Sequence, residues 1–415
     1  MKHIDNYIST GKESETLLIN QLSLLRAENK QEVYKFGFGQ SPFPIPEKIT
    51  QSLAQAAARK EYMSVQGDPK LRSAIAQFHR KFEHRNFDAD NIIIGTGSKI
   101  LIFSVLAAFN KVEVILPAPS WVSYEPQAKL VGHKVKWLET NFENRWRLTP
   151  QTLDDYCKQR KNPDVPLILV LNYPNNPTGQ SFDTEELKAL AGIMQKHHII
   201  VIADEIYSLL KLNGKQASIA DFYPQGTIIS SGISKWCGAG GWRLGFVHIP
   251  KELGKKLFRA VIGVASETYS CAAAPIQIAA TTAYTEENIA HKFLQQQRDL
   301  LNTVNKFCTQ KLNQARIRTH ACIGGFYLFP DFSAFKKELS QRNITNSNEL
   351  THAIMEDIGV ALLPGTAFGM PACSLTARLA FVDFDGSQIL NEGNIAHFDK
   401  LKKGIEKLCL WANNL

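Results

Sequence analysis

The sequence has no uninterrupted hydrophobic run long enough to cross a membrane. Its most apolar stretch, residues 92–109, is interrupted by Gly95, Gly97, Ser98 and Lys99, whereas a membrane helix needs about 20 consecutive apolar residues. The N-terminal residues are polar and lack the apolar core of a secretory signal. We therefore expect a cytoplasmic protein with no membrane contact.

The sequence also lacks the cysteine and histidine patterns of disulfide-bonded or metal-binding proteins. Its seven cysteines are scattered and form no CxxC pair, which argues against a disulfide framework or a zinc site. The eleven histidines have no metal-ligand spacing. His79 and His84 lie in a charged stretch, so we expect solvated histidines and no metal.

A concentrated basic patch is missing as well. The formal net charge is +8, but lysine and arginine are dispersed, with only short clusters such as residues 79–85. No helix-turn-helix or RNA-binding signature accompanies them. The charge therefore favours a basic enzyme that handles anionic small molecules over a nucleic-acid-binding protein.

From about residue 90 the sequence alternates β-branched runs with helical patterns. Strands are expected at Asn91–Ile94, Val112–Leu116, Val165–Leu171, Ile199–Ala203 and Thr227–Ser230, and helices at Lys99–Asn110 and Thr184–Lys196. Thr184 is a candidate N-cap of the second helix. Near-continuous apolar strands between helices are typical of an α/β fold, in which a mostly parallel sheet is covered on both faces.

After a helical stretch from about Lys251, the pattern changes to that of a smaller α+β domain. It predicts helices at Glu286–Gln314 and Ser347–Asp357, and strands at Phe326–Phe329, Val360–Leu363 and Ala377–Val382. We divide the chain into an N-terminal segment that joins the small domain (1–45), a large domain (46–284) and the small C-terminal domain (285–415).

Polar, glycine-rich or aromatic turns follow the predicted strands. They are Gly97–Lys99, Pro119–Trp121, Asn172–Gly179, Asp204–Tyr207 and Ser231–Arg243. Ligands of open parallel sheets bind beyond the carboxyl ends of the strands. We therefore predict that these turns converge on one site.

These turns resemble those of the aspartate-aminotransferase superfamily, the class I/II aminotransferases of pyridoxal-phosphate fold type I. The strongest matches are Asn172–Gly179, Ala203–Tyr207 and Ser234–Gly245, and the resemblance extends from about Gly37 to Phe381. It implies an enzyme that uses pyridoxal 5'-phosphate to move an amino group between an L-amino acid and a 2-oxo acid by a ping-pong mechanism.

The resemblance assigns catalysis to Lys235, Asp204 and Tyr207. Lys235 would carry the cofactor as a Schiff base and later move the substrate α-proton. An amine attacks only when neutral, and desolvation beside a cation such as Arg243 lowers a lysine pKa. Asp204 would keep the pyridine nitrogen protonated. Tyr207 and Asn176 would hydrogen-bond the phenolic oxygen.

Further residues would hold the cofactor ring and phosphate. Trp121 offers a face for stacking on the ring. The turn formed by Gly97, Ser98 and Lys99 opens a helix, which suits a phosphate. Arg243 would clamp that phosphate.

A serine contact to the phosphate is left open. Many relatives carry a hydroxyl three residues before the lysine, where this chain has Gly232, so both Ser231 and Ser234 are candidates. Tyr62 matches a tyrosine that reaches the phosphate of the partner subunit. The resemblance therefore implies a homodimer with shared active sites.

Arg378 matches the arginine that binds the substrate α-carboxylate, and Gly39 matches the loop glycine that closes over it. Trp121 and Asn176 are expected to line the same pocket, and residues 364–369 match the loop before the arginine's strand. In one bacterial branch the residue at Lys99 binds a distal carboxylate, which indicates aspartate- or glutamate-type substrates.

Another segment argues against acidic substrates. Glu267 and Tyr269 lie where relatives carry small polar pocket residues, and an inward Glu267 would oppose an acidic substrate. Alanine-type or aromatic substrates therefore stay as alternatives.

Two other functions share part of this pattern. A carbon–sulfur β-lyase of the same fold would share every cofactor residue named above. An effector-sensing regulator domain would need a DNA-binding domain ahead of it, and fewer than 40 residues precede Gly37.

Overall fold

The computed structural model describes residues 15–214, 217–387, 390 and 398–415. Its centre is a seven-stranded sheet with the order β1-β7-β6-β5-β4-β2-β3. The strands are β1 (Ile92–Gly95), β2 (Glu113–Ala118), β3 (Lys134–Glu139), β4 (Leu167–Asn172), β5 (Ile200–Asp204), β6 (Thr227–Gly232) and β7 (Gly245–His248). Only β7 runs against the other strands of this sheet. The predicted mostly parallel sheet is confirmed.

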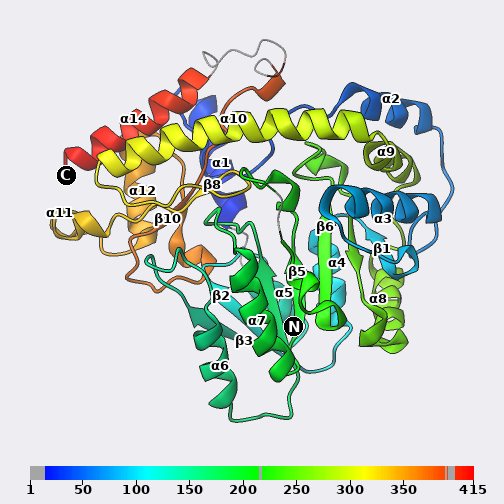
Figure 1. Cartoon of the computed structure of the whole chain (residues 1–415). Coiled ribbons are helices and arrows are strands. Elements are labelled where there is room, and N and C mark those ends of the chain that lie inside the picture. The colour runs from blue at the N-terminus through cyan, green and yellow to red at the C-terminus, as the bar shows by residue number, and fades with distance from the viewer. Residues whose placement is uncertain (1–14, 215–216, 388–389, 391–397) are drawn as a thin grey trace, which may run out of the picture.

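Helices cover both faces of this sheet (Figure 1), because successive strand residues point to opposite sides. Leu169 of β4 belongs to the core on one face and Ile168 to the core on the other. The first face carries α6 (Pro150–Lys158) and α7 (Thr184–Lys196). The second carries α4 (Ser98–Ala107), α5 (Tyr124–Leu130) and α8 (Lys255–Thr268).

A second, three-stranded antiparallel sheet has the order β8-β10-β9. Its strands are β8 (Tyr327–Leu328), β9 (Leu363–Pro364) and β10 (Ala377–Ala380). Around it lie α11 (Lys336–Gln341), α12 (Ser347–Ile358) and α14 (Asp399–Asn413). In Figure 1 the long helix α10 (Glu287–Gln314) runs along the top of the molecule, from α9 (Ala274–Thr285) to α14.

The N-terminal part of the chain contacts first the small sheet and then helix α9. After α1 (Glu15–Glu28), Tyr34 forms a parallel bridge with Val360, and the Phe36 carbonyl accepts a hydrogen bond from Ala380 N at 2.8 Å. The following helices, α2 (Glu47–Ala56) and α3 (Pro69–Glu83), pack against α9. The chain therefore passes from the small sheet to the large one near residue 43.

Several local predictions were wrong. Strands β3 and β7 were not predicted, because β3 alternates polar and apolar residues at the sheet edge and β7 has only four residues. The predicted strand Val360–Leu363 is instead Leu363–Pro364. The N-cap of α7 is Asp183, not Thr184: its carboxylate accepts from Glu186 N at 2.8 Å, and Glu186 bonds back in a capping box.

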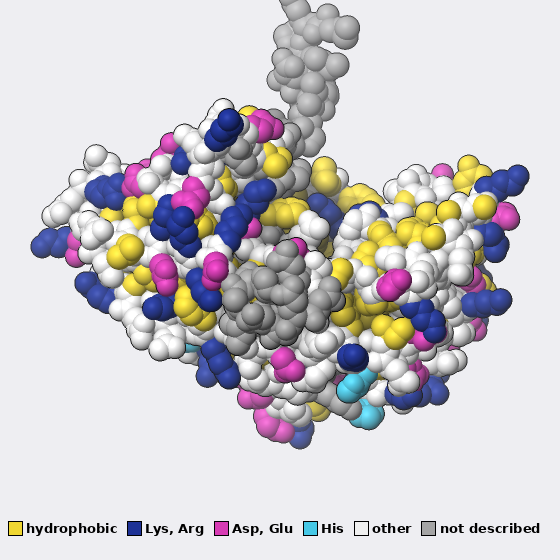
Figure 2. Space-filling view, turned by 90° about the horizontal axis from the view of Figure 1, so that it is seen from above, with side chains coloured by type: hydrophobic (Ala, Val, Ile, Leu, Met, Phe, Trp, Pro, Cys, Tyr) yellow, Lys and Arg dark blue, Asp and Glu magenta, His cyan; other side chains and the backbone are white. Residues whose placement is uncertain are grey.

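His79 is buried rather than solvated, and its ring nitrogen lies 2.5 Å from the Glu83 carboxylate. His84 is exposed, as expected. On the face drawn in Figure 2, lysine and arginine side chains are interspersed with acidic ones and form no continuous basic stripe. Among the described residues, no helix is both long and apolar enough to cross a membrane.

Candidate active site

One cavity of about 440 Å³ lies where the strand-end turns meet. It collects eleven of the predicted site residues: Gly39, Ser98, Lys99, Trp121, Asn176, Asp204, Tyr207, Ser234, Lys235, Arg243 and Arg378. The turns converge because β2, β4, β5 and β6 all point their carboxyl ends to this edge.

Lys235 follows β6 and reaches into the cavity. Its Nζ donates to the carbonyl oxygen of Gly39 at 2.9 Å and lies 5.6 Å from the ring centre of Tyr207. Desolvation by the surrounding protein lowers the pKa of Lys235, and the nearby cations Arg378 and Arg243 lower it further. The amine is therefore easier to deprotonate than an ordinary surface lysine.

Asp204 ends β5 and is buried. Its Oδ2 accepts a hydrogen bond from the Tyr124 hydroxyl at 2.6 Å, and its Oδ1 accepts one from Ile206 N at 3.3 Å. Burial raises the pKa of Asp204 to about 6. Sequence reasoning missed Tyr124, whose only signal was its place three residues after Trp121 at the start of α5.

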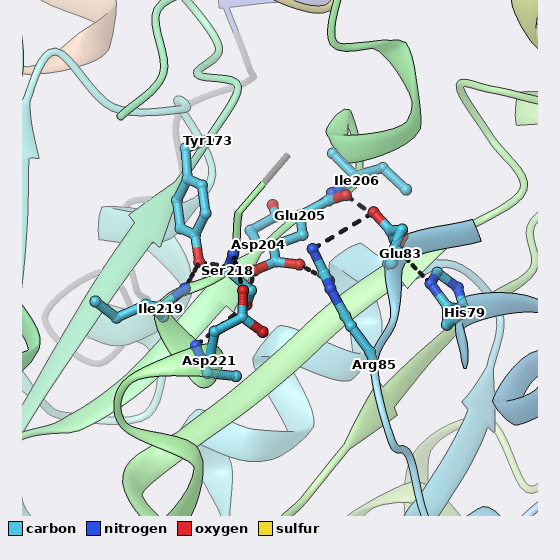
Figure 3. A network of polar contacts seen from close by, with 12 residues as sticks. His79, Glu83, Arg85, Tyr173, Asp204, Glu205, Ile206, Ser218, Ile219 and Asp221 are labelled. Atoms are coloured by element: carbon cyan, nitrogen blue, oxygen red, sulfur yellow. Dashed lines mark hydrogen bonds and ion pairs between the residues drawn. The ribbon is translucent and has the colours of Figure 1, made fainter. Parts of the chain in front are cut away.

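The residue after Asp204 anchors it to the protein (Figure 3). The Glu205 carboxylate is paired with Arg85 and accepts hydrogen bonds from the hydroxyls of Tyr173 at 2.6 Å and Ser218 at 2.5 Å. Its backbone N donates to Ser230 O at 2.9 Å. These contacts fix the backbone on which the Asp204 side chain stands.

Asn172 holds the same turn from the other side. Its Nδ2 donates to Asp204 O at 2.7 Å, and its Oδ1 accepts from Asn176 N at 2.7 Å. As expected from its place in the turn, Asn172 organises the backbone around the cavity. Asn176 is thereby held facing Arg378.

Arg378, on β10, is buried. Its Nη1 donates to Asn176 Oδ1 at 3.0 Å and its Nη2 to Gly37 O at 2.6 Å. Its Nε finds no hydrogen-bond partner within the described part of the chain. Burial of this guanidinium with donor capacity to spare suits an incoming carboxylate.

Tyr327 is a cavity residue that sequence reasoning missed. Its ring centre lies 4.9 Å from the Arg378 guanidinium, and its hydroxyl lies 2.9 Å from that of Tyr207. A Cβ at Gly39 would come within 2.0 Å of this hydroxyl. The only signal was an apolar strand pattern, which gave no reason to separate Tyr327 from its neighbours.

The part of the cavity at the N-terminus of α4 carries two cations. Arg243 lies against Gly97, where a Cβ would come 2.3 Å from Nη2 and where φ is +98°. Only glycine fits there. Lys99, in the first turn of α4, places its Nζ 5.7 Å from the ring centre of Trp121, and burial followed by the Arg243 charge lowers its pKa. Two cations thus meet at a helix N-terminus.

The two candidate serines are separated by the structure. Ser234 lines the cavity, whereas the buried Ser231 hydroxyl is directed to the Glu205 carbonyl at 3.5 Å. Gly232 stands against β7, where a Cβ would lie 2.7 Å from the Cα of Gly245. This close approach of two strands explains why a hydroxyl-bearing residue is absent at position 232.

Besides Gly97 and Ser231, three further residues singled out from the sequence do not line this cavity. Tyr62 is 93% exposed. Glu267 is exposed near the end of α8, so it does not oppose a ligand of this chain's own cavity. Tyr269 is half-buried, and its hydroxyl donates to Ile94 O at 3.2 Å.

The model of the family "Aminotransferase class I and II" matches residues 31–382. The chain belongs to this family. Class I and II aminotransferases typically use pyridoxal phosphate and act on amino acids and oxo acids. The resemblance predicted from the motifs is therefore confirmed, and the chain is an aspartate-aminotransferase-like transaminase.

Individual relatives agree with this assignment. An asparagine–oxo-acid transaminase of Streptococcus mutans is 30% identical over 382 residues, which cover 89% of this chain and 93% of the relative. An aspartate aminotransferase of Bacillus subtilis is 27% identical over 412 residues, covering 96% and 98%. The structure of a Thermus thermophilus aspartate aminotransferase with maleate superimposes with a TM-score of 0.86 at 24% identity, covering 99% and 100%. That likeness establishes the fold.

Proposed function

We propose that this aminotransferase binds pyridoxal 5'-phosphate covalently through Lys235 and transfers amino groups between an L-amino acid and a 2-oxo acid in two half-reactions. The observation that carries the proposal is the lysine itself. Its side chain lines the cavity, where desolvation lowers the pKa of the amine and the charges of Arg378 and Asp204 act on it. A lysine perturbed in this way in a cleft is a candidate for a chemical role.

The residues present fit this cofactor. Asp204 would pair with the ring nitrogen, Tyr207 and Asn176 with the phenolic oxygen, and Trp121 with the ring face. Arg243 would bind the phosphate, together with Ser234 and the backbone N–H groups of Gly97, Ser98 and Lys99 at the N-terminus of α4, which leaves the Lys99 ammonium group free. When bound, the cofactor withdraws electrons from the substrate α-carbon.

The chain's own residues then orient the substrate and move its proton. The Arg378 guanidinium would grip the α-carboxylate and fix the direction of the α-C–H bond. Lys235 Nζ would act as the base at that carbon and would return the proton in the second step. The Gly39 loop and Tyr327 line one side of the cavity, and the Tyr327 hydroxyl lies 3.4 Å from the Gly39 carbonyl.

Lys99 supports aspartate- or glutamate-type substrates. The cavity holds this ammonium group in addition to Arg378 and Arg243, so a substrate with two carboxylates finds a cation for each after the phosphate is bound. Glu267, which would have repelled an acidic side chain, does not line the cavity. The aspartate aminotransferase of Bacillus subtilis among the relatives acts on a substrate of this kind.

We also propose a homodimer with shared active sites and keep the division into segments 1–45, 46–284 and 285–415. Tyr62, a large side chain 93% exposed in the single chain, supports an interface that covers it. The small sheet lies wholly within residues 285–415, and Tyr34 and Phe36 bond to its surroundings.

The test is a titration of the purified protein with pyridoxal phosphate, followed by single amino acids without an acceptor. We expect a visible cofactor band that aspartate or glutamate converts and that oxaloacetate or 2-oxoglutarate restores. Lys235→Ala should abolish the covalent band. Lys99→Met should raise the aspartate concentration needed for conversion about tenfold or more, without affecting alanine.

Other results would change the proposal. Conversion by alanine or aromatic amino acids alone would keep the mechanism and reject the acidic substrates. Ammonia and pyruvate released from a thioether amino acid would indicate the β-lyase. A band that survives in Lys235→Ala would contradict the role of the lysine.

A further inference from the structure

Tyr327 stands where three distant parts of the chain meet. It is on β8, 1% exposed, and its hydroxyl lies 2.9 Å from the Tyr207 hydroxyl and 3.4 Å from the Gly39 carbonyl. Its ring covers the Arg378 guanidinium at 4.9 Å. Tyr327 therefore touches the turn after β5, the N-terminal loop and the carboxylate-binding strand at once.

The hydroxyl of Tyr327 carries one proton and has two possible acceptors. The Gly39 carbonyl is the poorer acceptor, because its distance is at the outer limit for an O–H donor and it already receives Lys235 Nζ at 2.9 Å. The Tyr207 oxygen is closer. In addition, a cation against the ring face withdraws electron density from the phenol and strengthens its O–H as a donor.

The direction of this bond decides what Tyr207 can do. A tyrosine hydroxyl donates a single hydrogen bond. If Tyr207 gives its proton to Tyr327, nothing remains for a ligand oxygen in the cavity. If Tyr327 is the donor, the Tyr207 proton is free to point into the cavity.

We propose that Tyr327 is a positioning residue: its hydroxyl donates to the Tyr207 oxygen and so directs the only proton of Tyr207 towards the phenolic oxygen of the bound cofactor. This inference rests on the proposed function of the site. The ring of Tyr327 also lies against Arg378. The hydroxyl donor and the proposed binding place of the substrate carboxylate therefore meet at one side chain. Chained hydroxyl donors strengthen each other in a low-dielectric site.

The experiment is a pH titration of the visible cofactor band in the holoenzyme of four proteins: wild type, Tyr327→Phe, Tyr207→Phe and the double variant. Loss of the Tyr327 donor weakens the hydrogen bond to the phenolate, so the apparent pKa of the band should rise by roughly half a unit to one unit. Tyr207→Phe should raise it at least as much. The double variant should match Tyr207→Phe alone, because Tyr327 acts through Tyr207.

Tyr284→Phe is the matched control, since it removes another buried hydroxyl outside the cavity, and it should titrate like wild type. An unchanged band in Tyr327→Phe, or an equal shift with and without the Tyr207 hydroxyl, would overturn the inference while leaving the proposed function intact. Absence of any cofactor band in the wild type would instead overturn the proposed function, and this inference with it.

Discussion

Burying a charged side chain in the cavity lowers the stability of the folded protein. Asp204 is the clearest case, because burial raises its pKa from 3.8 to about 6. The folded cofactor-free protein binds this proton more tightly than the unfolded chain does. The contribution of Asp204 to stability is therefore fully present below about pH 4 and is lost as the pH rises through about 6.

Replacing this carboxyl by an amide removes the pH-dependent cost. Asp204→Asn in the cofactor-free protein should unfold with a free energy higher than wild type by roughly 3 kcal/mol at pH 8, and the gap should widen by about 1 kcal/mol between pH 5 and pH 8. Urea unfolding at several pH values measures it. Transamination should fall by about 100-fold or more, since a neutral amide does not stabilise a protonated ring nitrogen.

Asp299→Asn is the control for this series. Asp299 is exposed on α10, so this change replaces a surface carboxylate by an amide outside the cavity. If the difference in unfolding free energy between Asp204→Asn and wild type is the same at every pH, the Asp204 carboxyl does not titrate in this range and the prediction fails.

Elements were predicted best where their residues are uniformly buried. Strands β4, β5 and β6 are buried along nearly their whole length, and the turns after them carry residues that line the cavity. The polar edge strand β3 and the short β7 had no such pattern. Tyr327 and Tyr124 could not be predicted either, because their roles depend on pairings with Tyr207 and Asp204 that only the tertiary fold creates.

The beginning of α7 offers a test at this scale. Asp183→Ala removes the acceptor for Glu186 N and should lower the free energy of unfolding by about 1 kcal/mol. Thr184→Ala changes the neighbouring exposed residue, which makes no cap, and should stay within about 0.5 kcal/mol of wild type. Urea unfolding compares the two. A larger loss of stability for Thr184→Ala would show that the threonine is the N-cap. Neither change should alter activity.

At the scale of the whole molecule, the single chain leaves Tyr62 in solvent although the cavity is otherwise assembled. Light scattering should give about twice the 46.4 kDa of one chain. Tyr62→Phe should keep that mass but weaken pyridoxal phosphate binding by about tenfold or more, because a hydrogen bond to a charged phosphate is lost.

Tyr156→Phe, which loses a hydroxyl bound to Glu113 outside the cavity, is the control and should bind the cofactor normally. A monomer with full affinity for the cofactor would contradict the shared site.

The bond between Arg378 and the Gly37 carbonyl joins residues 341 positions apart. During synthesis, the Gly37 carbonyl leaves the ribosome long before Arg378 does. The guanidinium can therefore be held in its place in the cavity only after nearly the whole chain has been made. A chain that ended before residue 378 would lack this cation and also the part of the buried core that β10 and α14 supply.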